Sequence, residues 1–185
     1  MADPVKRVIL SYEDYLSMPD DRNRYEILEG ELAVTPSPTS MHQLVSRNLA
    51  FILHCHLKQY RLGDILYAPM DVILSDISIV QPDLIYITRE HLHLITTRGI
   101  EGTPDMVIEI ISPASKRLDR VGKLQIYAKY GIAWYWLIDP LEKTLEIYML
   151  NHESYSLHGT YSQNDTVKPL LFPGLEFGLG EVWPE

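Results

Sequence analysis

The chain has 185 residues, of which 46% are apolar and 22% are charged. This length and balance are typical of one globular domain and exclude a mainly disordered chain. The net charge of −9 excludes a generally basic nucleic-acid coat protein, although an acidic chain can still carry a local basic groove.

Cysteine content and hydropathy indicate the compartment. Cys55 is the sole cysteine of the sequence, which excludes an intrachain disulfide and favours a reducing cytoplasm. No apolar run approaches the ~20 residues of a membrane helix, and no segment resembles a signal peptide. We expect a cytoplasmic protein without membrane contact, in which Cys55 packs among the apolar residues of a helix.

The N-terminal region, residues 11–35, predicts a short helix and a β-hairpin. Ser11 and Asp14 form a weak capping box at the start of the helix. Strand-forming residues then flank a turn at Glu29-Gly30 within residues 24–34, which is typical of a hairpin.

The core of the domain is expected over residues 41–150, with additional β-structure in residues 151–185. Continuous apolar strands between helices favour a mixed α/β sheet that is covered on both faces. The first predicted core element is a helix over 41–60, which is capped by Ser40 and ended by Gly63. A strand over 65–74 follows, with a bulge at Pro69. The remaining core elements are strands over 84–88 and 106–111, a helix over 117–130, and strands over 134–138 and 145–150.

Two acidic residues stand where the pattern predicts buried structure. Glu109 lies inside the apolar run 106–111, and an ionised carboxylate there is costly unless it is paired or binds a metal. Asp83 follows a proline at the start of the preceding strand. If the two strands are neighbours, the carboxylates converge, and oxygen ligands of this kind suit Mg²⁺ or Mn²⁺. The alternative is that Asp83 caps a turn and Glu109 pairs with a buried base.

A local reversal of charge follows the Glu109 strand. Residues 116–129 carry five bases and one acid, Asp119, and could position phosphate groups. An equally simple interpretation is a solvated helix face on which Asp119 and Lys123 form an i,i+4 pair. The histidines show no zinc spacing, and His42 is interpreted as a polar residue at a helix start.

Several motifs in order give the chain a resemblance to a known family. Together they resemble the Uma-type family of restriction-endonuclease-like proteins, a branch of the PD-(D/E)XK nuclease superfamily, from about residue 12 to residue 183. The motifs are Tyr25-Glu-Ile-Leu-Glu-Gly-Glu-Leu, Val80-Gln-Pro-Asp-Leu, Gly102-Thr-Pro-Asp-Met-Val-Ile-Glu-Ile-Ile-Ser-Pro, Asp119-x-x-x-Lys-x-x-x-Tyr127, Gly131-Ile-x-x-Tyr-Trp-Leu-Ile-Asp-Pro140 and Phe172-Pro-Gly-Leu.

The resemblance implies a restriction-endonuclease-like core, a mixed sheet flanked by helices in the order αβββαβ. It also implies that Asp83 and Glu109 hold Mg²⁺ or Mn²⁺, with the backbone carbonyl of Ile110 as a further ligand. The superfamily pattern E-x-K requires a lysine at position 111, where this chain has Ile111. The family then assigns that role to Lys123, although regular helical geometry places Lys123 about 130° from the apolar stripe of its helix and not plainly inward.

Further residues are weaker candidates for the site. Glu31, and after it Glu29, are possible extra acids from the hairpin. Gln81 is a candidate for orienting ligands, and Tyr127 for contacting phosphate or packing. The candidates for holding a nucleic-acid backbone are Lys116, Arg117 and Arg120, with Arg89 or Arg98.

The sequence is compatible with three candidate functions. The first is a metal-dependent phosphodiesterase acting on DNA, and a homodimer is expected by analogy with enzymes that cut duplexes. The second is an inactive module with the nuclease fold that binds nucleic acid or protein, favoured by Ile111 and the net acidity. The third is a hydrolase for small phosphate esters that uses the same carboxylates.

Overall fold

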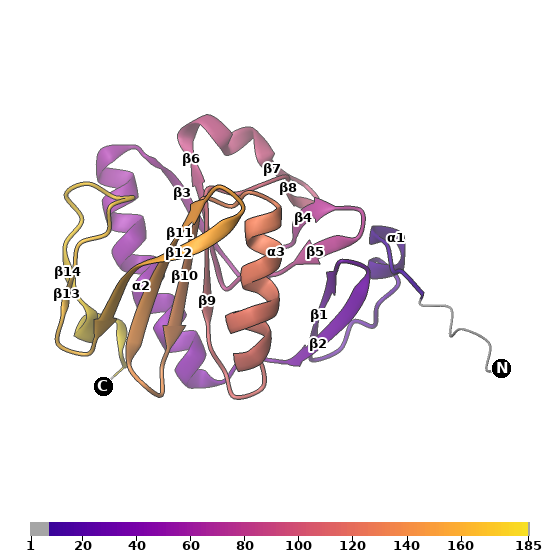
Figure 1. Cartoon of the computed structure of the whole chain (residues 1–185), viewed down its shortest axis with the longest axis horizontal. Helices are drawn as coiled ribbons and strands as arrows, with labels where there is room; N and C mark the ends of the chain where they lie inside the picture. The colour runs from indigo at the N-terminus through magenta and orange to yellow at the C-terminus, as the bar shows by residue number, and fades with distance from the viewer. Residues whose placement is uncertain (1–7, 185) are drawn as a thin grey trace.

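The structure, a computed structural model, describes residues 8–184 and is built around a six-stranded mixed sheet (Figure 1). Strands β9 and β10 run parallel, and every other neighbouring pair in this sheet is antiparallel. In spatial order the strands are β12 (Ser154–Ser162), β11 (Thr144–Asn151), β10 (Trp134–Asp139), β9 (Met106–Ile110), β6 (Leu84–Thr88) and β3 (Gly63–Tyr67).

Helices cover both faces of this sheet. Helix α2 (Ser40–Tyr60) buries Val45, Leu49, Leu53 and Leu57 against one face, and α3 (Leu124–Lys129) packs on the other (Figure 1). Because side chains alternate along a strand, each central strand contributes to two apolar cores. In β6, for example, Leu84 and Tyr86 face α2 while Ile85 and Ile87 face the α3 side.

A second, smaller sheet carries the N-terminal hairpin. Its strands lie in the order β2, β1, β5, β4, β8, β7, and β1 pairs with β2 in antiparallel register. The short helix α1 (Tyr12–Tyr15) precedes it. The strands are β1 (Asn23–Leu28), β2 (Glu31–Pro36), β4 (Val72–Ser75), β5 (Ser78–Val80), β7 (Ile95–Thr96) and β8 (Gly99–Glu101), with a 3₁₀ helix (Arg89–Leu94) before β7.

The C-terminal segment closes the core beneath α2. Strands β13 (Thr166–Val167) and β14 (Phe177–Gly178) pair with each other, and a 3₁₀ helix (Leu179–Val182) follows. Phe172, Val182 and Trp183 are buried in the same cluster as the apolar face of α2. The predicted additional β-structure in residues 151–185 is present as β12, β13 and β14, and the rest of this segment completes one core.

The fold class and the order of the core elements are confirmed. The core elements occur along the chain in the order αβββαβ, namely α2, β3, β6, β9, α3 and β10. The N-terminal hairpin is also present. The predicted strand over 65–74 is wrong, because the chain changes sheets at Pro69. Its first half is β3 on the edge of the central sheet, and its second half is β4 in the smaller sheet.

The predicted ends of α2 need correction. Thr39, not Ser40, is the N-cap, and its hydroxyl accepts a hydrogen bond from the His42 N–H. At the other end, Arg61 ends the helix in the left-handed conformation with φ 54°. Gly63 instead begins β3, where any Cβ would lie 2.0 Å from the carbonyl oxygen of Ile87. That glycine permits close strand pairing rather than helix termination.

The position of Cys55 and the hydropathy of the helices bear on two predictions from the sequence. Cys55 is exposed, so the prediction of a packed thiol is wrong; it lies off the apolar stripe of α2, which is formed by Val45, Leu49, Leu53 and Leu57. Within residues 8–184, no helix has the length and hydropathy needed to cross a membrane.

Candidate functional site

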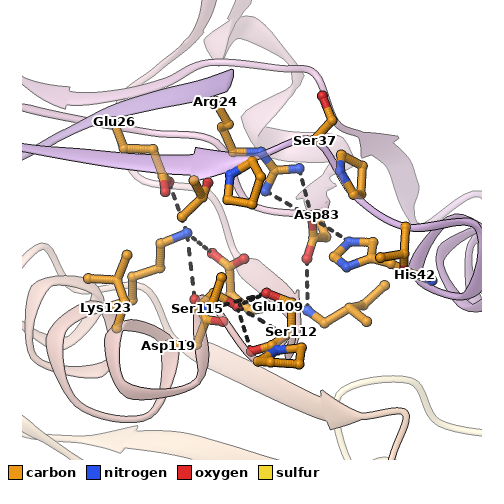
Figure 2. A pocket seen from close by; sticks show the side chains of 18 residues that line it. Arg24, Glu26, Ser37, His42, Asp83, Glu109, Ser112, Ser115, Asp119 and Lys123 are labelled. Carbon is orange, nitrogen blue, oxygen red and sulfur yellow. Dashed lines mark hydrogen bonds and ion pairs between the residues drawn. The ribbon is translucent and has the colours of Figure 1, made fainter. Parts of the chain in front are cut away.

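A small cavity of about 190 Å³, which we call the acid pocket, lies between the hairpin and the central sheet (Figure 2). Its walls come from β1, the end of β2, the start of α2, the residue before β6, the strand β9, and the helical segment that precedes α3. The charged residues that line it are Arg24, Glu26, His42, Asp83, Glu109, Asp119 and Lys123.

Asp83 forms one side of the acid pocket and is held by three partners. Its Oδ1 lies 3.0 Å from both terminal nitrogens of Arg24 and 3.0 Å from Nε2 of His42. Its Oδ2 accepts a hydrogen bond of 2.8 Å from the Ile110 N–H. Burial acts to raise the pKa of Asp83, but His42, Arg24 and this N–H together hold that pKa below its ordinary value. Asp83 is therefore a fixed, ionised carboxylate.

Glu109 forms the opposite side, on β9. Its Oε1 accepts hydrogen bonds from Lys123 Nζ at 2.9 Å and from the Tyr127 hydroxyl at 2.5 Å. Burial raises the pKa of Glu109 to about 8; the charge of Lys123 opposes the rise, and neighbouring carboxylates add to it. The two carboxylates that the sequence singled out thus face one pocket but differ in their ease of ionisation.

Two further buried acids complete the cluster. Lys123 Nζ lies 2.9 Å from Glu26 Oε1 and 3.9 Å from Asp119 Oδ1, so one ammonium group serves three carboxylates (Figure 2). Burial and nearby acids raise the pKa of Asp119, while Lys123 opposes this. All five of Glu26, Asp83, Glu109, Asp119 and Lys123 are at most 2% exposed. Four carboxylates thus face two permanent cations, Arg24 and Lys123.

The orientation of Lys123 differs from the one that regular helical geometry predicts. Lys123 points into the acid pocket because residues Leu118–Lys123 form a π-helix, with hydrogen bonds of the i→i+5 type. This wider turn rotates the side chains that follow relative to an α-helix. Asp119 and Lys123 are therefore buried together, and the interpretation as a solvated surface pair is wrong. Ile111 packs in the apolar core on the α3 side.

The hairpin acid in the acid pocket is not the predicted one. Glu31 is exposed and does not line the pocket, and Glu29 pairs with Lys129 near the surface. Glu26 lines it instead, because it lies on the buried face of β1. Gln81 contributes through its backbone, since its N–H donates to Glu26 Oε1 at 2.8 Å and its carbonyl accepts from Arg24.

The remaining predicted residues lie around the site. Tyr127 is fully buried and donates to Glu109, so it does not face solvent. Ile110 meets Asp83 through its N–H. The predicted backbone-binding residues do not line the acid pocket. The Lys116 Nζ lies 3.5 Å from Asp139 Oδ2, and the Arg120 Nη1 lies 3.0 Å from Glu146 Oε1. Arg98 pairs with Glu101, and Arg117 and Arg89 are exposed.

Sequence reasoning missed Arg24, Glu26, His42 and Asp119 as site residues. His42 and Arg24 carried no local signal, because only the fold brings the hairpin and the start of α2 to Asp83. Asp119 did carry a local sequence signal, because it lies four residues before the lysine that the family resemblance assigned to the site. Glu26 lies in a segment of β1 where consecutive residues are buried, so no alternating pattern in the sequence marked it as inward-facing.

The acid pocket fits a divalent cation in charge and in donor type. Carboxylate oxygens suit Mg²⁺ and Mn²⁺, and the four acids of the pocket outnumber its two permanent cations. Across the described part of the chain, however, no three His, Cys, Asp or Glu side chains form a ready-made metal-binding group. Arg24 contacts Oδ1 of Asp83 and Lys123 contacts Oε1 of Glu109, so a metal that binds both acids competes with these cations.

Comparison with known proteins agrees with this architecture. Residues 12–180 match the family named Uma2 and described as "Putative restriction endonuclease". An uncharacterised protein of Synechocystis sp. is 25% identical over 179 residues, which cover 94% of this chain and 91% of that protein. A crystal structure from Anabaena variabilis, described as a putative nuclease belonging to DUF820, superposes with a TM-score of 0.76 at 19% identity. It covers 94% of this chain and 97% of its own, which shows a shared fold.

Proposed function

Since the chain belongs to the Uma2 family, described as "Putative restriction endonuclease", we propose that it is a metal-dependent nuclease that hydrolyses DNA phosphodiester bonds in the acid pocket. The observation that carries this proposal is the buried cluster of four carboxylates around two cations. A purely structural cluster would be expected to balance its charges, because an uncompensated buried carboxylate is destabilising.

Asp83 and Glu109 are the proposed ligands of Mg²⁺ or Mn²⁺, with the carbonyl of Ile110 as a third donor. A divalent ion bound there would lower the pKa of a coordinated water and offset negative charge on the phosphate. Asp83 is suited to this role because three contacts fix its oxygens before a ligand arrives. Glu109 gains most from a cation, because burial disfavours its ionised form.

The cations of the acid pocket have a second role in the proposal. Once released from the carboxylates, the Lys123 ammonium and the Arg24 guanidinium would lie at the pocket wall as partners for phosphate oxygens. Arginine binds phosphate through two parallel hydrogen bonds, and lysine acts as a point charge. Glu26 and Asp119 would keep Lys123 positioned near Glu109. In this way Lys123 would replace the lysine that the superfamily pattern places at position 111.

A cleavage assay tests the proposal. Purified protein is incubated with plasmid, linear duplex and single-stranded DNA in Mg²⁺, in Mn²⁺ and in EDTA. We expect cleavage that requires metal and falls at least 100-fold in Asp83→Asn and in Glu109→Gln. Glu101→Gln, which alters a surface ion pair, is the matched control and should retain full activity. Equal cleavage by all four proteins would refute the site.

A second candidate is an inactive module that keeps the nuclease fold. It is favoured by the occupation of the carboxylates by Arg24 and Lys123 and by the lack of a ready-made metal-binding group among the described residues. Such a module predicts that millimolar Mn²⁺ leaves the melting temperature unchanged. The nuclease predicts a rise in wild type that is lost in Glu109→Gln.

A further inference from the structure

A second, larger hollow leads into the acid pocket. It encloses about 730 Å³ and shares Arg24, His42 and Asp83 with the acid pocket. One wall is a continuous face of α2, and the other is β3 at the edge of the central sheet. We call it the aromatic groove; its other lining residues are Gln43, Ser46, Arg47, Ala50, Phe51, His54, Asp64, Ile65, Leu66, Tyr67, Ala68 and Ile95.

Two exposed aromatic rings distinguish the aromatic groove. Phe51 on α2 is 68% exposed, and Tyr67 at the end of β3 is 65% exposed. The helical spacing of residues 43, 46, 47, 50, 51 and 54 gathers them on one face of α2, and Phe51 lies at the edge of that face. Neither ring contributes to the apolar cores of the fold. Large apolar side chains left open beside a polar site are typical of a binding surface.

The charges along the groove favour an anionic ligand close to the site. Arg47 bonds to the amide oxygen of Asn48, and within residues 8–184 no carboxylate pairs with it. His42 and His54 also line the groove, whereas its acids are Asp64 and the already paired Asp83. Lys116, Arg120 and Lys129, by contrast, each pair with an acid.

We infer that the aromatic groove binds a single-stranded nucleic acid and delivers its backbone to the acid pocket, an inference that rests on the proposed nuclease function. Exposed rings can stack on unpaired bases, whereas bases inside a duplex present only their edges. The groove follows α2 from His42 to His54, about 18 Å at 1.5 Å per residue, which accommodates a few nucleotides. The net charge of −9 argues against the broad basic surface that a duplex requires.

The test measures binding in EDTA, so that it does not depend on metal or cleavage. Fluorescence anisotropy compares a labelled 12-nucleotide oligo-dT, the same length of oligo-U, and a 12-base-pair duplex. We expect both single strands to bind more tightly than the duplex, with affinity lowered about fivefold or more in Phe51→Ala and in Tyr67→Ala. Tyr60→Ala is the matched control, because Tyr60 is an exposed aromatic of α2 outside the groove.

The outcomes separate this inference from the proposed function. Duplex binding equal to that of the single strands, or equal affinity in Phe51→Ala, Tyr67→Ala and Tyr60→Ala, would overturn the groove assignment even if the protein cleaves DNA. Equal binding of poly-glutamate would also overturn it, because charge alone would then explain capture. Aromatic-dependent binding in a protein that never cleaves would instead support the groove while refuting the nuclease.

Discussion

The acid pocket and the aromatic groove meet at Asp83 but are built in opposite ways. In the acid pocket the four carboxylates and Lys123 are buried, and each is paired with an oppositely charged group, so each side chain supports the fold as well as any reaction. In the aromatic groove Phe51 and Tyr67 are exposed and Arg47 lacks an acidic partner in the described part of the chain. Substitutions should therefore affect stability and activity together in the pocket and binding alone in the groove.

The largest effect on stability is expected from Lys123→Met. This substitution leaves Glu26, Glu109 and Asp119 buried without their shared cation, and breaking such a pair typically costs about 3–5 kcal/mol. Urea unfolding followed by circular dichroism measures the loss. The control is Lys129→Met, which removes a largely exposed pair with Glu29 and should cost far less, because solvent screens such a pair. Similar losses in both variants would show that the pocket lysine is not a structural centre.

The acid pocket should also make stability depend on pH. Burial raises the pKa of Glu109 from 4.5 to about 8, so between these values the folded protein binds a proton that the unfolded chain has released. The free energy of unfolding should then fall as pH rises from about 5 to 8. Glu109→Gln cannot titrate, so the difference between wild type and this variant isolates the effect. A difference that is constant with pH would contradict the assignment.

A smaller effect is expected from Tyr127→Phe. It removes the hydroxyl that donates to Glu109, and leaving a buried polar group without its partner costs about 1–3 kcal/mol. Tyr135→Phe is the matched control, because its equally buried hydroxyl donates to the backbone carbonyl of Asp119 and should cost about 1 kcal/mol. Thermal or urea unfolding distinguishes the two; a larger loss in the control would argue that the hydrogen bond from Tyr127 to Glu109 does not stabilise the fold.

The smallest effect on stability is expected in the groove. Phe51→Ala removes a ring that is mostly solvent-exposed, and such surface changes usually alter the free energy of unfolding by no more than about 0.5 kcal/mol. The same unfolding measurement checks this. A loss above about 2 kcal/mol would mean that Phe51 packs as a core residue and would remove the contrast between the two regions.

The sequence predicted the fold better than it predicted the site. Apolar periodicity located α2, β6, β9 and β10, because burial on one or both faces leaves a direct pattern in the residue order. It failed at residues 65–74, where the chain passes from one sheet to another within an unbroken strand-like run. Nothing in local propensity records which sheet a strand joins.

The limits of prediction at the site have the same origin. Asp83 and Glu109 stood out because acids are unusual beside apolar strands, and both do line the acid pocket. Arg24 and His42 reach Asp83 from segments 59 and 41 residues away in sequence, which no local pattern encodes. Lys123 was found by resemblance while its orientation was missed, because a π-helix has no simple sequence signature.

The central claim is that the acid pocket is a metal site, and calorimetric titration with Mn²⁺ tests it most directly. The account predicts one binding event in wild type and in Glu101→Gln, and none in the Asp83→Asn/Glu109→Gln double variant. The double variant is first shown to be folded by circular dichroism. No binding to folded wild type at millimolar Mn²⁺, or binding that the double variant retains, would contradict the claim and leave the carboxylates with a structural role alone.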